Sequence, residues 1–326
     1  MRKVMSDKTF GAKPMHKSNS FIKEMKTNFS LFILLVPGFV VVLLMSYLPL
    51  PGILMAFQEY RFYTGNFFMN LLKCKWVWFD NFWLFFNDKY FTYAVQTTIG
   101  YNLFFLVSGT TISLIIAIVI NELTNRKMSK LLHNCMLLPY LLSWVVFSYV
   151  VFAFLGSENG FINRSILSPL GLKNINFYIN AGYWPVILFI VNTIKFAGYG
   201  SILYLSAIVG IDPEYYESAI IDGATKWQQI TKITVPLISH VVIITVILTL
   251  GNIMTADFGL FYNVPRQSPF LRQATDIVDI YVYRKLQDGK MAVSAAAGLL
   301  KSVIGLITVL TANFAIRKID REKALF

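Results

Sequence analysis

The sequence predicts an all-α integral membrane protein with six transmembrane helices. Hydrophobic residues make up 56% of the chain and charged residues only 14%, and the mean hydropathy is +0.58. This composition is too apolar for a soluble domain. Four charge-free stretches each exceed the roughly 20 residues that cross a bilayer core. They lie between Lys26 and Glu59, Lys89 and Glu122, Lys130 and Glu158, and Lys232 and Asp257.

Two further spans are expected over 183–211 and 291–316, which are equally apolar except for Lys195 and Lys301. The first span follows a basic segment, as in a secretory signal, but its apolar run continues without a small-residue cleavage site and is expected to be a retained anchor. We expect one membrane domain over 30–317, between tails at 1–29 and 318–326.

The basic residues predict the orientation of the chain. Sixteen Lys and Arg residues fall on the side that holds both predicted tails, and eleven fall on the other side. Because basic loops stay in the cytoplasm, both termini are expected there. The net charge of +12 then reflects membrane topology and contact of the basic tail with anionic lipid, and nucleic acid is not an expected partner.

No metal or nucleotide chemistry is expected in this chain. Cys74 and Cys135 are too few and too far apart for a disulfide framework or a metal site, and the histidines, His16, His133 and His240, form no metal-spaced pair. The sequence also lacks a G-x-x-x-x-G-K-[ST] phosphate loop. We therefore expect neither a cofactor nor an enzymatic activity.

A polar segment, "EYYESAIIDGATKWQQITKITVP" (214–236), interrupts the apolar runs between the fourth and fifth spans. Asp212 and Pro213 supply a helix start, and Asp222-Gly223 ends that helix after about two turns. Gly223 allows a backbone turn with positive φ. A second short helix is expected from Ala224 to Lys232, so the segment 212–236 predicts a compact cytoplasmic helix–turn–helix.

Within this segment the order Glu217-Ser218-Ala219, Asp222-Gly223-Ala224 and Pro236 resembles the "EAA" loop of ABC importer permeases. Ser218 departs from the usual middle alanine but is also small. The stretches "WFDNFWLFFNDKYF", "LLPYLLSWVVFSYV" and "YVYRKLQDGKMAVSAAAGLLKSVIGL" extend the resemblance over about residues 30–317. They look like parts of maltose-type permeases of the oligosaccharide and polysaccharide branch.

The resemblance implies a type I importer permease fold in a bacterial cell membrane, with a coupling helix between spans four and five. It further implies a second homologous permease, a cytoplasmic ATPase dimer that holds ATP and Mg, and an extracellular sugar-binding protein as partners. The six residues Glu217, Ser218, Ala219, Asp222, Gly223 and Ala224 are then expected to contact the ATPase, Glu217 and Asp222 through charge. The cargo would be an oligosaccharide, and the outer loops 157–182 and 263–290 would touch the binding protein.

Ionisable, amide and aromatic residues in or near the spans are the candidates for a substrate path. A lysine at membrane depth is costly and normally faces a bundle interior or a wet cavity. An amide inside a span must likewise find hydrogen bonds. Both groups serve internal packing as readily as substrate, and aromatic residues at span ends also serve as interfacial anchors. The candidates are Tyr140, Trp144, Asn192, Lys195, Tyr199, Asn252, Asp257 and Lys301.

Some interpretations stay open at this point. Pro139, Gly198 and Gly200 are consistent with hinges or with packing kinks. The aromatic segment 60–91 favours a helix in the headgroup layer over a sugar-binding surface.

Three other functions are weighed against the importer permease. One is an importer permease for another solute. An ion-coupled secondary transporter would use Lys195 or Lys301, yet only Asp257 is a nearby acidic partner. A membrane enzyme would need a convergent catalytic set, whereas the neighbours Lys301 and Ser302 point in different directions.

Overall fold

The computed structural model describes residues 28–61, 63 and 65–319 in two units, which divide between Gly52 and Ile53. The predicted tails lie almost wholly outside these residues. In the described part of the first unit, α2 (Phe29–Val42) continues through a π-helical turn η1 (Leu43–Tyr47). With the 3-10 helix η2 (Leu50–Phe57) it forms a 29-residue apolar segment, long enough to cross a membrane.

In the second unit a short insertion with two strands follows η2. Strands β1 (Gln58–Glu59) and β2 (Lys75–Trp76) pair antiparallel and flank the helix α3 (Phe67–Lys73), before α4 (Asp80–Asn87) leads into the next span. Asn81 holds the insertion together, because its side-chain amide donates to the carbonyls of Ala56 and Gln58 at 2.9 and 3.0 Å. This two-stranded ladder is the one sheet among the described residues.

Four long helices of the second unit are candidate membrane spans. They are α5 (Lys89–Glu122), α8 (Trp184–Val209, preceded by the 3-10 turn η4, Ala181–Tyr183), the segment that ends in α11 (Val235–Gly251), and α15 (Met291–Ile319). α5 packs most extensively on α8, and α11 packs on α15. Gly200 permits the first approach, since a Cβ there would lie 2.5 Å from the Ser113 hydroxyl.

The third predicted span is bent rather than straight. Helices α6 (Arg126–Leu141) and α7 (Trp144–Leu155) meet at 100°, so the described residues hold five candidate spans, or six when this bent pair counts as one. Pro139 lies in the last turn of α6, and the Ser143 hydroxyl caps α7 by accepting from the Val146 N–H at 3.3 Å. A proline and a new N-cap four residues apart explain why the helix ends here.

α8, in contrast, runs unbroken through Gly198 and Gly200. A Cβ at position 198 would lie 2.2 Å from the Met136 carbonyl oxygen, so α6 and α8 approach closely at this glycine. Of the two interpretations left open for the glycines, packing matches the observed geometry.

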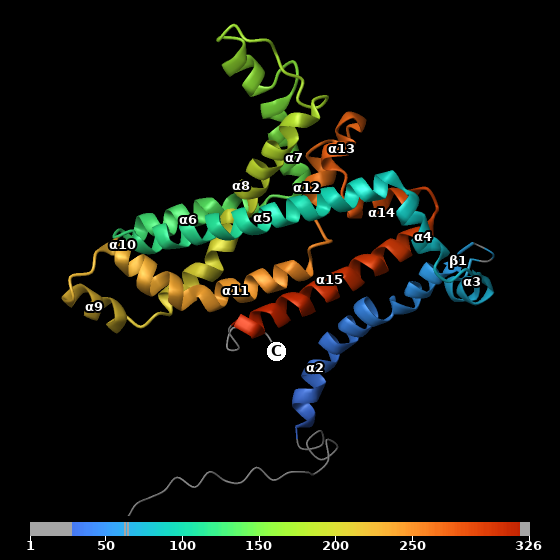
Figure 1. Ribbon diagram of the computed structural model, residues 1–326, viewed down its shortest axis with the longest axis horizontal. Coiled ribbons are helices and arrows are strands. Elements are labelled where there is room, and N and C mark those ends of the chain that lie inside the picture. Colours follow the sequence, from blue (N-terminus) through green and yellow to red (C-terminus); the bar gives the residue numbers. More distant parts are fainter. Residues whose placement is uncertain (1–27, 62, 64, 320–326) are drawn as a thin grey trace, which may run out of the picture. The chain divides into compact units, whose positions relative to one another are not determined.

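Short helices cover one end of the second unit (Figure 1). After α7 the chain forms the π-helical turn η3 (Ile162–Leu167), and after α11 it forms α12 (Phe258–Asn263), η6 (Pro269–Leu271), α13 (Arg272–Thr275) and α14 (Val278–Gln287). The opposite end carries α9 (Glu214–Ile221) and α10 (Lys226–Gln229), which a π-helical turn η5 (Ile230–Thr234) joins to α11. The second short helix predicted to end at Lys232 is thus continuous with the fifth span.

Candidate functional site

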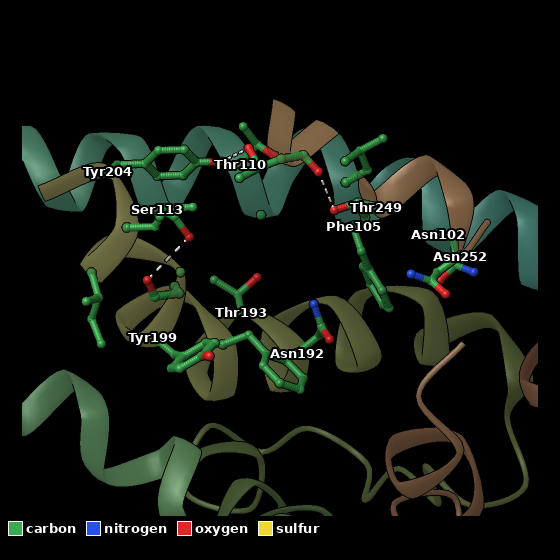
Figure 2. Close-up of a pocket in the computed structure, with 18 of the residues that line it drawn as sticks. Asn102, Phe105, Thr110, Ser113, Asn192, Thr193, Tyr199, Tyr204, Thr249 and Asn252 are labelled. Atoms are coloured by element: carbon green, nitrogen blue, oxygen red, sulfur yellow. Dashed lines mark hydrogen bonds between the residues drawn. The ribbon is translucent and has the colours of Figure 1, made fainter. Parts of the chain in front are cut away.

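A cavity of about 670 Å³ lies between α5, α8 and α11. Polar side chains from all three helices face it alongside apolar ones such as Phe105 (Figure 2). The polar residues are Asn102, Thr110 and Ser113 from α5, Asn192, Thr193, Tyr199, Tyr204 and Ser206 from α8, and Thr245, Thr249, Asn252 and Thr255 from α11 and the segment after it. These hydroxyl and amide groups gather at one place between helices that are otherwise mostly apolar.

Some of these polar groups hold the walls of the cavity together. The Asn102 amide donates to the carbonyls of Ile253 and Thr255 at 2.7 and 3.1 Å, which ties α5 to the end of α11. The Ser113 hydroxyl donates to the Ala197 carbonyl of α8 at 3.3 Å. These side chains already have hydrogen-bond partners in the protein. They therefore shape the cavity and are not free donors toward it.

Three other polar side chains in the cavity lack a hydrogen-bond partner among the described residues. They are the Asn192 amide, the Thr193 hydroxyl and the Thr110 hydroxyl. Asn192 and Thr193 point from α8 toward α5 (Figure 2). Because an unsatisfied polar group inside a membrane is costly, these side chains are available to water or to a bound polar molecule.

Tyr199 adds a flat aromatic surface to the cavity wall. Its ring stacks on Tyr140 of α6 with a centroid separation of 4.1 Å and an interplanar angle of 5°. The Tyr199 side chain is half exposed. Tyr140 itself lies outside the cavity lining, and its ring packs against the ring of Tyr199.

Lys195 lies on α8 close to Asn192 in sequence but outside the cavity lining, and only 4% of its surface is exposed. Its ammonium group donates to the carbonyls of Pro139 and Tyr140 at 3.1 and 3.2 Å, and to that of Leu142. It also lies 4.8 Å from the Trp144 ring centroid. Lys195 therefore satisfies the last carbonyls of α6 at the break before α7.

Trp144 and Asp257 continue this contact into α12. The Trp144 indole N–H donates to the Asp257 carboxylate at 2.9 Å, and the other Asp257 oxygen accepts from the Leu260 N–H at 3.2 Å and caps α12. Gly259 leaves room for the indole, because a Cβ there would lie 2.0 Å from a ring carbon. Trp144 and Asp257 thus connect two helices outside the cavity lining.

Lys301 of α15 forms an ion pair with Asp279 of α14, and the second Asp279 oxygen accepts from the Ala256 N–H at 3.1 Å. From the sequence, Asp257 was the one acidic residue expected near the lysines of the spans, and Asp279 was missed. The reason is that 22 residues and a chain reversal separate Asp279 from Lys301. The structure therefore brings Asn192, Tyr199 and Asn252 to the cavity and places Tyr140, Trp144, Lys195, Asp257 and Lys301 outside its lining.

The loop between α8 and α11 presents its motif on the surface. Glu217, Ser218, Asp222 and Gly223 are exposed, and Ala219 and Ala224 are partly exposed. Gly223 has φ of 76°, as the sharp turn requires. Large apolar side chains join them, with Ile221 85% and Trp227 73% exposed. An exposed apolar group of this kind is typical of a docking surface for another protein.

The same loop contacts the start of α11 and the end of α5. The hydroxyls of Tyr216 and Thr234 lie 2.9 Å apart and link α9 to the start of α11. Thr225 and Gln228 form a capping box at the start of α10. The Thr-x-x-Gln pattern of this box is present in the sequence but was not identified there. Lys226 also pairs with Glu122 at the end of α5, at 3.2 Å.

The polar cavity thus lies inside a bundle of spans, and a surface loop joins two of the helices that line it. The chain belongs to the family described as "Binding-protein-dependent transport system inner membrane component". The match covers residues 109–321. The protein is thus a multi-pass inner-membrane permease of an ABC transport system, a transport component without a catalytic domain.

Named relatives cover nearly the whole chain. Protein LplB of Bacillus subtilis (strain 168) is 32% identical over 307 residues, which is 94% of each chain. The polygalacturonan/rhamnogalacturonan transport system permease protein YteP of the same strain is 31% identical over 294 residues, 90% of this chain and 89% of YteP.

A solved structure is similar in fold as well as in sequence. One chain of the bacterial alginate ABC transporter, in complex with an alginate pentasaccharide-bound periplasmic protein, superposes with a TM-score of 0.81 and 31% identity. The match covers 91% of this chain and 97% of that one.

Proposed function

We propose that this chain is the permease subunit of an ATP-driven importer for oligosaccharides or polysaccharide fragments, and that it forms half of the translocation path. The relatives named for alginate and polygalacturonan transport support a saccharide cargo. The chemistry of the cavity supports it as well, because free amide and hydroxyl groups beside an aromatic ring match the hydroxyls and the apolar face of a sugar.

The observation that carries the proposal is the placement of the exposed loop. α9 and α10 directly connect α8 and α11, and both of these helices line the cavity. A displacement of the loop therefore moves two cavity walls together. When ATP and Mg close a cytoplasmic ATPase dimer, the attached loop would tilt α8 and α11 and open the cavity to the other side of the membrane.

We infer the partners from the family of the chain. Glu217 and Asp222 would pair with basic groups of the ATPase, while Ser218, Ala219, Gly223 and Ala224 would allow close approach. The loop and both termini then lie in the cytoplasm of the cell. A second homologous permease would complete the path. An extracellular sugar-binding protein would dock at the outer loops 157–182 and 263–290.

Within the path, Asn192, Tyr199 and Asn252 are proposed to contact the sugar. Substrate contact by Tyr140, Trp144, Lys195, Asp257 and Lys301 stays a prediction, and the structure favours positioning roles for them. An ion relay through Lys195 has less support, because backbone carbonyls bind its ammonium group. Asp279 is the acidic partner that a relay through Lys301 would need, but this pair lies outside the cavity lining.

The test is copurification of the tagged chain from mild detergent, expressed with its neighbouring genes, together with uptake of labelled oligosaccharide. Glu217→Lys and Gly223→Pro are compared with Glu214→Lys, an exposed glutamate of the same helix outside the motif. We expect an ATPase and a second permease to accompany the wild type and Glu214→Lys, and the ATPase alone to be lost from Glu217→Lys and Gly223→Pro. Retention of the ATPase together with normal uptake in both motif variants would contradict the proposed coupling loop.

A further inference from the structure

The cavity between α5, α8 and α11 is polar but uncharged. Its lining residues in the described part of the chain include serine, threonine, asparagine and tyrosine but no lysine, arginine, histidine, aspartate or glutamate. The polar groups that it offers are therefore neutral donors and acceptors, and at physiological pH it carries no fixed charge.

Two lysines inside the spans, Lys195 and Lys301, lie outside the cavity lining. Lys195 follows Thr193 by two residues on α8, yet its ammonium group turns away from the cavity to the carbonyls of α6. Lys301 is neutralised by Asp279. The fold thus satisfies the lysines of these spans with protein groups, so neither is free to meet an anionic cargo.

This arrangement discriminates between two classes of saccharide. A neutral sugar unit exchanges hydrogen bonds with water for hydrogen bonds with amides and hydroxyls, at little net change in free energy. A uronic acid unit brings a carboxylate that must give up part of its hydration to groups that offer no counter-charge, and this desolvation is costly. An uncharged cavity therefore favours neutral sugars.

We propose that this cavity is a subsite for an uncharged, hydroxyl-bearing sugar unit, and that this permease selects neutral oligosaccharides over uronic acid oligosaccharides. The proposal rests on the saccharide-importer function proposed above. It sets the chain apart from the relative of known structure, which imports the acidic polysaccharide alginate.

The free side chains define how the sugar unit would be held. The Asn192 amide offers both a donor and an acceptor, and the Thr193 hydroxyl lies beside it on α8, with the Thr110 hydroxyl across the cavity on α5 (Figure 2). The Tyr199 ring, supported by Tyr140, is the apolar surface for a sugar face. Neutral groups on opposite walls can thus contact hydroxyls on both edges of one ring.

The test uses the whole importer complex in lipid nanodiscs without its binding protein, so that the binding protein's own preference does not contribute. Saturation-transfer NMR compares a neutral hexose tetrasaccharide with the tetrauronide of the same linkage. We expect the neutral sugar to bind about tenfold more tightly or better. We also expect Asn192→Ala and Thr193→Val to weaken that binding several-fold.

Two variants make the readout specific. Thr111→Val removes an exposed hydroxyl next to Thr110, one that bonds the Val107 carbonyl and lies outside the lining, and should leave binding unchanged. Thr193→Lys places a cation in the cavity and should shift the preference toward the uronide.

The outcomes separate this inference from the proposed function. The inference would be overturned if the wild type bound the uronide as tightly as the neutral sugar or more tightly. It would also be overturned if Asn192→Ala and Thr193→Val left binding of the neutral sugar unchanged. The importer function would stand in both cases. If the complex neither binds nor imports any oligosaccharide, the proposed function itself fails and the inference fails with it.

Discussion

Lys195 of α8 donates from its ammonium group to the backbone carbonyl of Leu142, at the break between α6 and α7. The contact joins the helix that leads into the exposed loop to the bent span. A buried cation with three carbonyl acceptors also explains how an irregular backbone segment persists at membrane depth, since those carbonyls have no helical partner.

Lys195→Met should destabilise the protein by about 3 kcal/mol, because the last carbonyls of α6 lose their donor while remaining buried. The measurement is the unfolding midpoint of the detergent-solubilised chain. Lys226→Met is the matched control: that lysine is largely exposed in its pair with Glu122 and should contribute less than about 1 kcal/mol. Equal effects of the two substitutions would show that the Lys195 contacts contribute little.

Lys301 and Asp279 should behave as a coupled pair. Either Lys301→Met or Asp279→Asn leaves one partly buried charge without its partner and should cost roughly 3 kcal/mol, whereas the double substitution should cost clearly less than the sum. A double-mutant cycle on thermal unfolding measures this coupling. Strictly additive losses would mean that the ion pair is energetically unimportant.

Asp88 should make the stability of the contact between α5 and α14 depend on pH. It caps α5, accepts from the Tyr281 hydroxyl at 2.8 Å and pairs with Lys285 at 3.3 Å. Burial alone would raise the pKa of Asp88, but these hydrogen bonds and that of the Tyr90 N–H outweigh it and lower the pKa below its ordinary value.

Since the folded-state pKa of Asp88 is the lower one, its stabilisation is fully present above the unfolded pKa of about 4. It is lost as the pH falls through the folded value. The unfolding midpoint measured from pH 7 to pH 3 should therefore depend less on pH in Asp88→Asn than in the wild type. An unchanged slope in Asp88→Asn would contradict this assignment.

The same contact predicts a loss of stability at alkaline pH. Burial and the hydrogen bond to Asp88 raise the pKa of Tyr281 above its ordinary value. The neutral phenol is thus favoured in the folded state, and its contribution disappears as the pH rises beyond about 10. Tyr281→Phe should flatten this alkaline limb when unfolding is followed from pH 8 to pH 11. If the stability of Tyr281→Phe falls as steeply with pH as that of the wild type, other groups cause the alkaline loss.

Gly259→Ala should cost about 2 kcal/mol, because the added methyl group would displace the Trp144 ring and strain its bond to Asp257. Gly298→Ala is the control, since a Cβ there meets nothing within 4 Å in this chain. The measurement is the unfolding midpoint of the isolated subunit. If Gly259→Ala is as stable as Gly298→Ala, the Trp144 side chain has room to move at little cost.

The candidate site was only partly predictable. Asn192, Tyr199 and Asn252 were identified as polar or aromatic residues inside spans, whereas the free hydroxyls of Thr110 and Thr193 were missed. Threonine is common in spans and usually bonds its own helix, as Thr111 does with the Val107 carbonyl. A free hydroxyl is therefore visible only once the neighbouring helices are in place.

By itself the sequence determined the membrane class, the positions of the spans and the turn at Asp222-Gly223, because hydropathy and turn chemistry act over a few neighbouring residues. The tertiary structure alone decided the bend between α6 and α7, the pairing of Lys301 with Asp279, and the direction in which Lys195 points. Lipid-facing and buried sides of a membrane helix are both apolar, so the sequence carries little record of how each helix is rotated. That rotation places the neutral side chains in the cavity and the lysines outside its lining.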